Sequence, residues 1–304
     1  MDTGRRDFLR LGLLCGGCSL AGMGISRGQE TTWHLAAYQR AAEKIRPLFS
    51  KKKPPGPFDW LANQTESGQT FAQYRKSNPN RPTAERTKLY LQQIGDFTKP
   101  EETAVETLRE FMALYFGLEI AVPDKIGLDQ IPATAKRPLG RTLEDQILTT
   151  HILDKMLLPK RPKDAVAVLA ITASDLWPGD GWNFVFGMAS LENRVGVWST
   201  RRFGDPVAEY PKFLRRVLQV AVHETGHMFG IEHCTAYECC MNGSNSLDES
   251  DRNSMVYCCE CDPKLWWACK LEPAKRARAL AELSKKHSLE REALEWGRIA
   301  NALG

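Results

Sequence analysis

One short stretch, HETGHMFGIEH at residues 223–233, constrains the fold of this chain more than any other. On a helix, His223 and His227 are one turn apart, so both imidazoles project from the same face toward a single ion. Gly230 can end that helix in a sharp turn, because glycine takes a positive φ without steric cost. The turn would bring His233 back as a third ligand. The stretch therefore predicts a helix, a tight turn and three imidazoles around one metal ion.

The residue types in this stretch indicate a catalytic zinc site. Three imidazoles hold zinc with one position open for water, whereas structural zinc sites are closed. Glu224 is displaced around the helix from His223, so its carboxylate can reach a zinc-activated water. We expect Glu224 to act as general base, taking a proton from that water and passing it to the leaving amine of a peptide bond. The alternative is that these histidines are hydrogen-bonded inside a core helix and bind no metal. Gly230 and His233 disfavour it, because both stand at the positions that a three-histidine zinc motif requires.

Seven of the nine cysteines fall within residues 234–269 and form a second metal-binding pattern. Two pairs separated by a loop can enclose a zinc with four thiolate ligands, a closed site that adds folding energy but does no chemistry. The pairs we expect are Cys234 with Cys239 and Cys258 with Cys261. An odd, clustered set is a poor disulfide framework, although disulfide pairing is the alternative. Three cysteines are surplus and their pairing is left open, with Cys259 also creating an ambiguity of register: Cys240, Cys259 and Cys269.

The N-terminal segment has the pattern of an export signal. Arg5 and Arg6 precede an apolar run at residues 11–23 that is too short to span a bilayer comfortably. The pattern resembles a twin-arginine signal, with Gly4 where such signals usually carry Ser or Thr. We expect export to the periplasm or the cell exterior; the alternative is an ordinary N-terminal helix and a cytoplasmic protein. Export in a folded state would allow metal loading in the reducing cytosol, which favours zinc over disulfides.

Composition and charge narrow the range of partners. With 42% hydrophobic and 26% charged residues, the chain is an ordinary globular protein. A net charge of +4 is too mild to argue for nucleic acid, and the basic run at residues 51–53 precedes prolines and reads as a linker. We therefore expect a monomer that acts on a peptide or protein substrate, with no nucleic-acid partner and no stable membrane insertion.

Apolar periodicity predicts an α/β domain with a mixed twisted sheet. A continuous apolar run at residues 165–172 suits a strand buried on both faces. Other strands are expected at 87–94 and 118–122, with a hairpin of 183–189 and 194–199. Helices are expected at 31–49, 100–116, 141–158 and 213–230 and over most of 273–303, and residues 58–83 read as loop. We divide the chain into an export signal (1–27), an N-terminal extension and linker (28–85), a catalytic domain (86–233) and a C-terminal subdomain (234–304).

Together these motifs resemble the archaemetzincin family. That family joins HExxHxxGxxH directly to a cysteine, a second cysteine five residues later, a methionine and a later CxxC, and this chain has each element, including Met241. The spacing from Met241 to Cys258 is one residue shorter than the usual form. Asp175 with residues 183–187 is similar to the family's segment around its substrate-side edge strand. Residues 56–61 and 68–71 are similar to the extension of the longer, animal-like members.

The resemblance implies a metzincin (zincin-like) fold with a mixed sheet of about five strands, an antiparallel edge strand above the active-site helix, and a small C-terminal subdomain with a structural zinc. It implies a zinc metallopeptidase, either an endo- or an aminopeptidase, with two zinc ions, one catalytic and one structural. Met241 would form a Met-turn beneath the catalytic zinc, a packing base without a chemical role. The backbone of 183–189 would pair with an extended substrate. The alternative is a catalytically weak, zinc-dependent peptide-binding protein.

Overall fold

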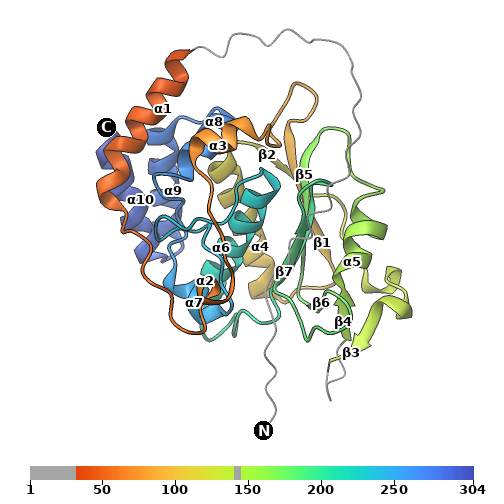
Figure 1. The fold of residues 1–304 in the computed structure, drawn as a ribbon. Helices are drawn as coiled ribbons and strands as arrows, with labels where there is room; N and C mark the ends of the chain where they lie inside the picture. The colour runs from red at the N-terminus through yellow and green to blue at the C-terminus, as the bar shows by residue number, and fades with distance from the viewer. Residues whose placement is uncertain (1–31, 140–144) are drawn as a thin grey trace.

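The computed structural model of the protein describes residues 32–139 and 145–304. The expected export signal therefore lies outside the described residues. Within the described ranges, no helix combines the length and the apolarity needed to cross a membrane. Helices, a central sheet and a smaller layer beyond it make up the fold (Figure 1).

A mixed five-stranded sheet lies at the centre, in agreement with the mixed sheet predicted from periodicity and the strand number implied by the resemblance. Its order is β2-β1-β5-β8-β7, and neighbouring strands are parallel except β7, which is antiparallel to β8 at one edge. Every residue of β5 is buried, because this apolar strand has partners on both edges and packed layers on both faces. The strands are β1 (Lys88–Ile94), β2 (Glu119–Ala121), β5 (Ala165–Thr172), β7 (Gly187–Ser190) and β8 (Val195–Ser199).

Helices cover one face of the sheet and a smaller layer covers the other (Figure 1). On the first face, α4 and α6 join the larger apolar core; α4 ends at Gly117, whose φ of 64° is a left-handed conformation that glycine adopts without steric cost. On the second face, η4 packs on the sheet within a smaller core. The longer helices are α1 (Thr32–Ile45), α4 (Lys99–Phe116), α6 (Tyr210–Met228), α8 (Asp262–Cys269), α9 (Pro273–Lys286) and α10 (Glu290–Leu303). The short ones are η1 (Arg46–Leu48), α2 (Trp60–Asn63), α3 (Phe71–Lys76), η2 (Leu128–Gln130), η3 (Ala133–Ala135), α5 (Thr149–His151), η4 (Ile152–Leu157) and α7 (Leu247–Arg252).

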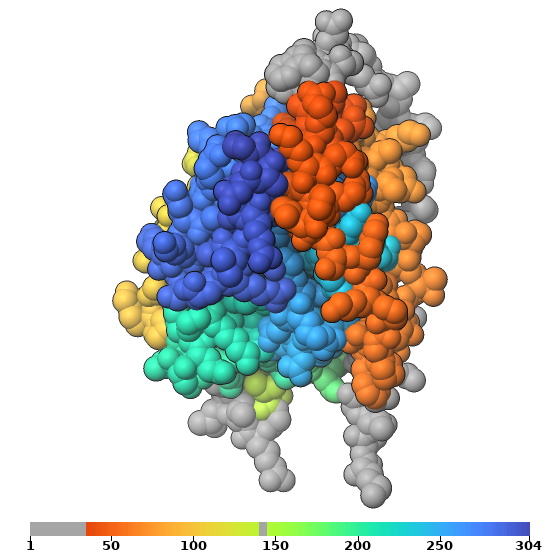
Figure 2. Space-filling model, turned by 90° about the vertical axis from the view of Figure 1, so that its left-hand side faces the viewer, coloured from red at the N-terminus to blue at the C-terminus, as the bar shows by residue number. Residues whose placement is uncertain are grey.

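The N-terminal helix packs against the C-terminal helices, although they are far apart in sequence. Figure 2 shows α1 lying beside the C-terminal part of the chain on one face of the molecule. Tyr38 of α1 is buried there, and its hydroxyl donates a hydrogen bond to the Leu271 carbonyl at 3.0 Å. Ala42 and Ile45 join the same apolar core. The N-terminal extension is therefore part of the packed fold.

The helix expected over residues 141–158 was wrong in its first part. Residues 140–144 lie outside the described ranges, and Asp145–Leu148 form a strand, β4. β4 pairs with β3 (Lys136–Pro138) and β6 (Asp175–Trp177) in a second, three-stranded sheet that the sequence did not predict. The helical region comprises only α5 and η4. Ile147 fits the spacing of a helix, but its burial comes from sheet pairing, a tertiary effect that outweighs local periodicity.

The loop expected over residues 58–83 was wrong in part, because it contains the short helices α2 and α3. Thr70 caps α3: its hydroxyl accepts a hydrogen bond from the Gln73 N–H, while the Gln73 side chain accepts one from the Thr70 N–H. This reciprocal arrangement is a capping box, and its Thr-x-x-Gln signature is present in the sequence.

Candidate active site

The active-site helix α6 carries the first two histidines, and a tight turn follows it. Gly230 adopts a φ of 79°, a left-handed conformation that a larger residue would take only with strain. The N–H of Ile231 donates to the Gly226 carbonyl at 3.0 Å, which closes the turn. The chain then reverses, so His233 comes to lie beside His223 and His227.

The three imidazoles converge on one point. One ring nitrogen from each of His223, His227 and His233 lies within 4.8 Å of the others, and the Nε2 atoms of His223 and His227 are 3.0 Å apart. Each Nδ1 faces an acceptor outside the cluster: the Cys240 carbonyl for His223 (2.7 Å), the Ile231 carbonyl for His227 (2.8 Å) and the Glu66 carboxylate for His233 (2.8 Å). This arrangement keeps the proton on Nδ1 and directs every Nε2 inward.

The electrostatics of the cluster suit a cation. Burial, and then the neighbouring His233, lower the pKa of His223 to about 4, and burial lowers the pKa of His227 well below its usual value. Neutral imidazoles are the form that binds a metal. The Nε2 atom of His233 is buried without a hydrogen-bond partner among the described residues, and so is Oε2 of Glu224. An inward-facing set of imidazoles with an orphaned acceptor fits a zinc ion.

Glu224 lies beside this cluster and is nearly inaccessible, with 6% of its surface exposed. Burial raises the pKa of its carboxyl to about 7. Such a carboxyl can take up and release a proton near neutral pH, which is the property required of a general base.

A cleft of about 580 Å³ opens over the histidines. Its floor includes Val220, His223 and Glu224 of α6. One wall is the segment 183–187 that leads into the edge strand β7, and the opposite wall combines residues 57–59 with the loop and helix around α7. The site is therefore open on one side, and a chain lying in the cleft would pass over Glu224.

The wall at residues 183–187 is braced from behind by polar side chains, of which the sequence analysis singled out only Asp175. Asp175 is 1% exposed and forms an ion pair with Arg202 at 2.7 Å. The Gln146 amide donates to Asp175 at 2.7 Å and to the Asn183 carbonyl at 2.9 Å. Arg137 donates to the same carbonyl at 2.8 Å. These residues lie on β3, β4, β6 and the loop after β8, so no local pattern links them.

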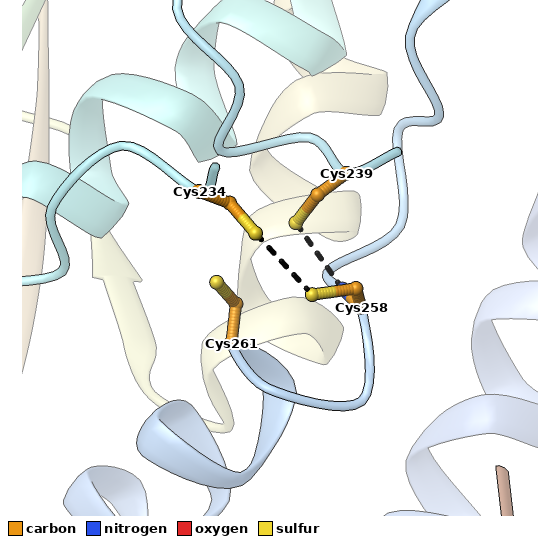
Figure 3. Close-up of side chains that lie close together, drawn as sticks. All are labelled: Cys234, Cys239, Cys258 and Cys261. Atoms are coloured by element: carbon orange, nitrogen blue, oxygen red, sulfur yellow. Dashed lines mark hydrogen bonds between the residues drawn. The ribbon is translucent and has the colours of Figure 1, made fainter. Parts of the chain in front are cut away.

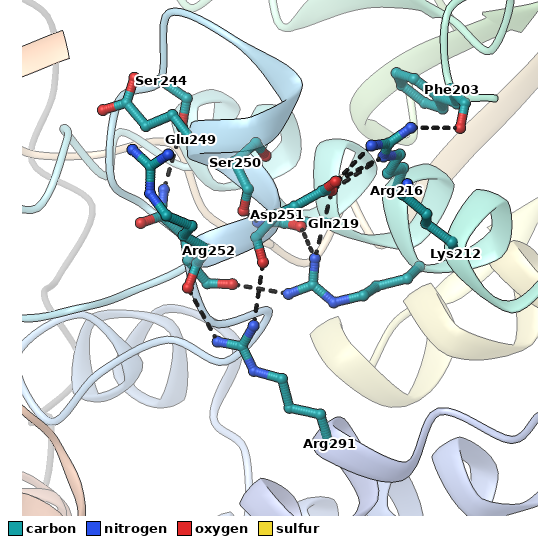
Figure 4. A network of polar contacts seen from close by, with 12 residues as sticks. Phe203, Lys212, Arg216, Gln219, Ser244, Glu249, Ser250, Asp251, Arg252 and Arg291 are labelled. Carbon is teal, nitrogen blue, oxygen red and sulfur yellow. Dashed lines mark hydrogen bonds and ion pairs between the residues drawn. The ribbon is translucent and has the colours of Figure 1, made fainter. Parts of the chain in front are cut away.

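The opposite wall is held by charges that join α7 to α6 and α10 (Figure 4). Arg216 of α6 donates to the Asp251 carboxylate at 3.0 Å and to the Phe203 carbonyl at 2.9 Å. Gln219 of α6 donates to the Ser250 carbonyl at 2.8 Å, and Arg291 of α10 donates to the Asp251 carbonyl at 3.1 Å. The network fixes α7 in place beside the active-site helix.

The four cysteines expected to form a second site do meet (Figure 3). Their sulfur atoms lie within 4.8 Å of one another, and all four side chains are buried: Cys234, Cys239, Cys258 and Cys261. Sγ of Cys239 accepts hydrogen bonds from the N–H groups of Met241 (3.4 Å) and Cys258 (3.2 Å). Burial raises the pKa of the Cys239 and Cys258 thiols, so four thiolates at this distance require a cation. A closed, buried set of four sulfurs fits a structural zinc.

All seven cysteines of the described ranges are free thiols, so the structure contains none of the disulfides considered as alternatives there. Cys258 rather than Cys259 faces the cluster, which resolves the ambiguity of register. The Cys259 thiol interacts instead with the Tyr237 hydroxyl. The Cys240 thiol donates to the Gln219 carbonyl at 3.7 Å.

Met241 lies directly beneath the active-site helix. It is fully buried, and a methyl group added at Gly226 of α6 would lie 2.6 Å from its sulfur. Its carbonyl accepts a hydrogen bond from the Cys234 N–H at 2.7 Å. Met241 therefore packs between the active-site helix and the cysteine cluster.

Comparison with known proteins agrees with this geometry. The sequence model of Peptidase family M54 matches residues 160–266. Archaemetzincin-2 of Homo sapiens is 32% identical over 283 residues, which cover 80% of this chain and 76% of the relative. The archaemetzincin of Pyrococcus furiosus is 33% identical over 162 residues, covering 51% of this chain and 80% of the relative. The crystal structure of the archaemetzincin from Methanopyrus kandleri superposes with a TM-score of 0.50 at 31% identity, covering 62% of this chain and 99% of that one.

Proposed function

Because the chain belongs to the archaemetzincin family of zinc metallopeptidases, we propose that it hydrolyses peptide bonds with Glu224 as general base at a zinc held by His223, His227 and His233. The observation that carries this proposal is the place of Glu224. Its carboxylate is buried, follows His223 directly in the helix, and lines the cleft above the imidazoles. Oε2 of this carboxylate accepts no hydrogen bond from the described residues, so it is free to accept one from a bound water.

The chain's own residues supply the proton transfers. Zinc, when bound, supplies a Lewis acid that polarises a carbonyl and makes a water more acidic. With its pKa raised to about 7 by burial, Glu224 accepts a proton from the attacking water and then donates it to the leaving amine. The acceptors on the three Nδ1 atoms hold the imidazoles in one tautomer and orientation throughout.

We further propose that an extended peptide adds to the edge of the central sheet along residues 183–189. β7 is an edge strand whose single strand partner within the described residues is β8, and the segment leading into it lines the cleft. An unpaired strand edge offers backbone donors and acceptors to a peptide backbone. The ion pair between the buried Asp175 and the partly exposed Arg202 supports this wall.

We propose two zinc ions for each chain, the second held by Cys234, Cys239, Cys258 and Cys261. Its role is structural, because all four sulfurs are buried and none lines the cleft. Elemental analysis of purified protein is expected to give two zinc ions per chain. A value of one would contradict the proposed zinc site of the four cysteines.

Export through a twin-arginine signal is proposed from the sequence alone, from Arg5, Arg6 and the apolar run at 11–23. Replacing both arginines by lysine is expected to retain the protein in the cytoplasm. Cell fractionation with an antibody against the mature protein measures this, and unchanged export of the double variant would contradict the proposal.

The proposed mechanism is tested by Glu224→Gln, with Glu232→Gln as a matched control in the same motif. Glu232 is exposed, so its replacement should leave activity unchanged. Glu224→Gln should lower kcat by about 10²- to 10⁴-fold while the zinc content stays at the wild-type value. Cleavage of a peptide library is the readout. Unchanged cleavage by Glu224→Gln would refute the mechanism, and a wild-type protein that binds library peptides but cleaves none would favour the peptide-binding alternative.

A further inference from the structure

The segment 56–80, which we call the strap, lies across the end of the active-site helix. It includes α2 and α3 and belongs to the N-terminal extension. Three of its side chains donate hydrogen bonds to the helix end and the turn: Asn80 to the Met228 carbonyl (3.0 Å), Tyr74 to the Phe229 carbonyl (2.9 Å) and Gln69 to the Gly230 carbonyl (3.2 Å). The Trp60 N–H donates to the Glu249 carboxylate in the cleft wall at 2.9 Å. The Phe71 N–H donates to Glu260, beside the cysteine cluster, at 2.7 Å. The strap thus joins the end of the active-site helix to the cleft wall and to the cysteine region.

One residue of the strap reaches a proposed zinc ligand. The Glu66 carboxylate lies 2.8 and 3.1 Å, through its two oxygens, from Nδ1 of His233. The Trp60 ring packs edge-on against the same imidazole, with ring centroids 5.2 Å apart and an interplanar angle of 77°. Together they enclose His233, whose side chain is only 7% exposed.

His233 needs this support more than the other two imidazoles do. His223 and His227 are fixed by their positions on α6, and backbone carbonyls accept from their Nδ1 atoms. His233 follows the turn at Gly230 and lies on no helix or strand. Its orientation therefore depends on what surrounds it, and a carboxylate is the acceptor there.

A carboxylate on the outer nitrogen of a zinc-bound imidazole fixes the tautomer and raises the basicity of the inner nitrogen. Here the inner nitrogen, Nε2 of His233, is buried and without a hydrogen-bond partner among the described residues. The ring is thus held with its bare nitrogen toward the other two imidazoles.

We propose that Glu66 is a positioning residue for the third zinc ligand, and that the strap is thereby an integral part of the active site. The inference rests on the proposed zinc site of His223, His227 and His233. It concerns a residue outside residues 160–266, the part matched by the family's sequence model. Zinc binding at this site and docking of the strap are accordingly coupled.

The test compares Glu66→Ala with Glu85→Ala in the full chain. Glu85 is an exposed carboxylate of the same extension, and its side chain accepts a hydrogen bond from Thr83. The affinity for the zinc of the histidine site, which we expect to be the more weakly held of the two, is measured by competition with a chromophoric chelator. Glu66→Ala should bind that zinc about 10- to 100-fold more weakly, and Glu85→Ala should match the wild type. Wild-type affinity in Glu66→Ala, or an equal loss in Glu85→Ala, would overturn the proposal.

Glu66→Gln separates positioning from packing. Its amide oxygen still accepts the Nδ1–H bond but carries no charge, so its zinc affinity should lie between those of the wild type and Glu66→Ala. If the alanine variant folds poorly, Glu66→Gln replaces it in the zinc-affinity measurement. A Glu66→Gln protein with an affinity as low as that of the alanine variant would contradict orientation by hydrogen bonding.

Proton NMR of the zinc-loaded protein supplies a readout that simple loss of packing would not move. The Nδ1 proton of His233 should give a deshielded, slowly exchanging signal that persists in Glu85→Ala and is lost in Glu66→Ala. An unchanged signal in Glu66→Ala would refute the contact. Zinc affinity and this signal do not depend on peptide cleavage, so a failed mechanism for Glu224 and a failed role for Glu66 are distinguishable.

Discussion

The histidine cluster and the cysteine cluster lie close together in sequence but differ in how they are enclosed. The first offers three imidazoles, includes a residue that lines the cleft, and has a buried carboxyl beside it. The second offers four sulfurs, and none of them lines the cleft. A metal in the first site can meet a substrate, whereas a metal in the second can only hold chain segments together. Access, as much as ligand type, separates the two roles.

The two clusters also differ in how their ligands are gathered. The histidines come from one short stretch, and helix geometry with a single turn assembles them. The cysteines come from two pairs on either side of α7, so their meeting depends on the loop between Cys239 and Cys258. The three histidines are therefore brought together mainly by local backbone geometry. The four cysteines are brought together only when the loop between the two pairs has folded.

The largest expected effect follows from opening the cysteine cluster. Cys258→Ser should lose one zinc per chain and destabilise the protein by on the order of 5 kcal/mol or more, because structural zinc binding contributes directly to folding. Cys259→Ser is the matched control, since this neighbouring thiol lies outside the cluster. Zinc analysis and chemical denaturation measure both. If the two variants behaved alike, the assignment of Cys258 as a ligand would fail.

A chelator should distinguish the two sites by access. The zinc of the histidine site, which meets the cleft, should leave first, with complete loss of peptide cleavage and a loss of roughly 3 kcal/mol in unfolding free energy. The zinc of the cysteine cluster should remain, with the near-ultraviolet circular dichroism preserved. Timed chelation followed by zinc analysis measures the order. Release of both zinc ions together with unfolding would break the distinction between them.

The smallest expected effect concerns Met241, which packs between the clusters. Met241→Leu keeps the volume and apolarity of this buried side chain, so it should cost less than about 1.5 kcal/mol and leave zinc content and kcat near wild-type values. Thermal unfolding and peptide cleavage are the measurements. A large loss of kcat with normal stability would show that the methionine sulfur does more than pack.

The sequence predicts those features that depend on local geometry. The three histidines could be assembled from helix spacing and one glycine, and the buried strand β5 from its continuous apolar run. A sheet of about five strands with an antiparallel edge followed from the resemblance to archaemetzincins. β4 was misassigned because its apolar spacing suits a helix, while pairing with β3 and β6 decides its structure.

The missed residues act across long sequence separations. Glu66 and His233 are 167 positions apart, and no periodicity connects a carboxylate in the N-terminal extension to a ligand after a helix. Arg202 and Gln146 likewise meet Asp175 only through the arrangement of strands. The capping box at Thr70 and Gln73 is different, because its signature is local and could have been found in the sequence.

His233 and Cys234 are consecutive residues that face different clusters, and this adjacency has a consequence for protein synthesis. The strap leaves the ribosome first, the complete histidine motif follows, and Cys258 and Cys261 emerge last. A nascent chain ending at residue 240 would already contain every histidine of the motif. It would lack Met241, whose carbonyl accepts a hydrogen bond from the Cys234 N–H, and the second cysteine pair. Hydrolytic competence should therefore arise late, when the second cysteine pair has emerged, so incomplete chains would carry the motif without an assembled centre.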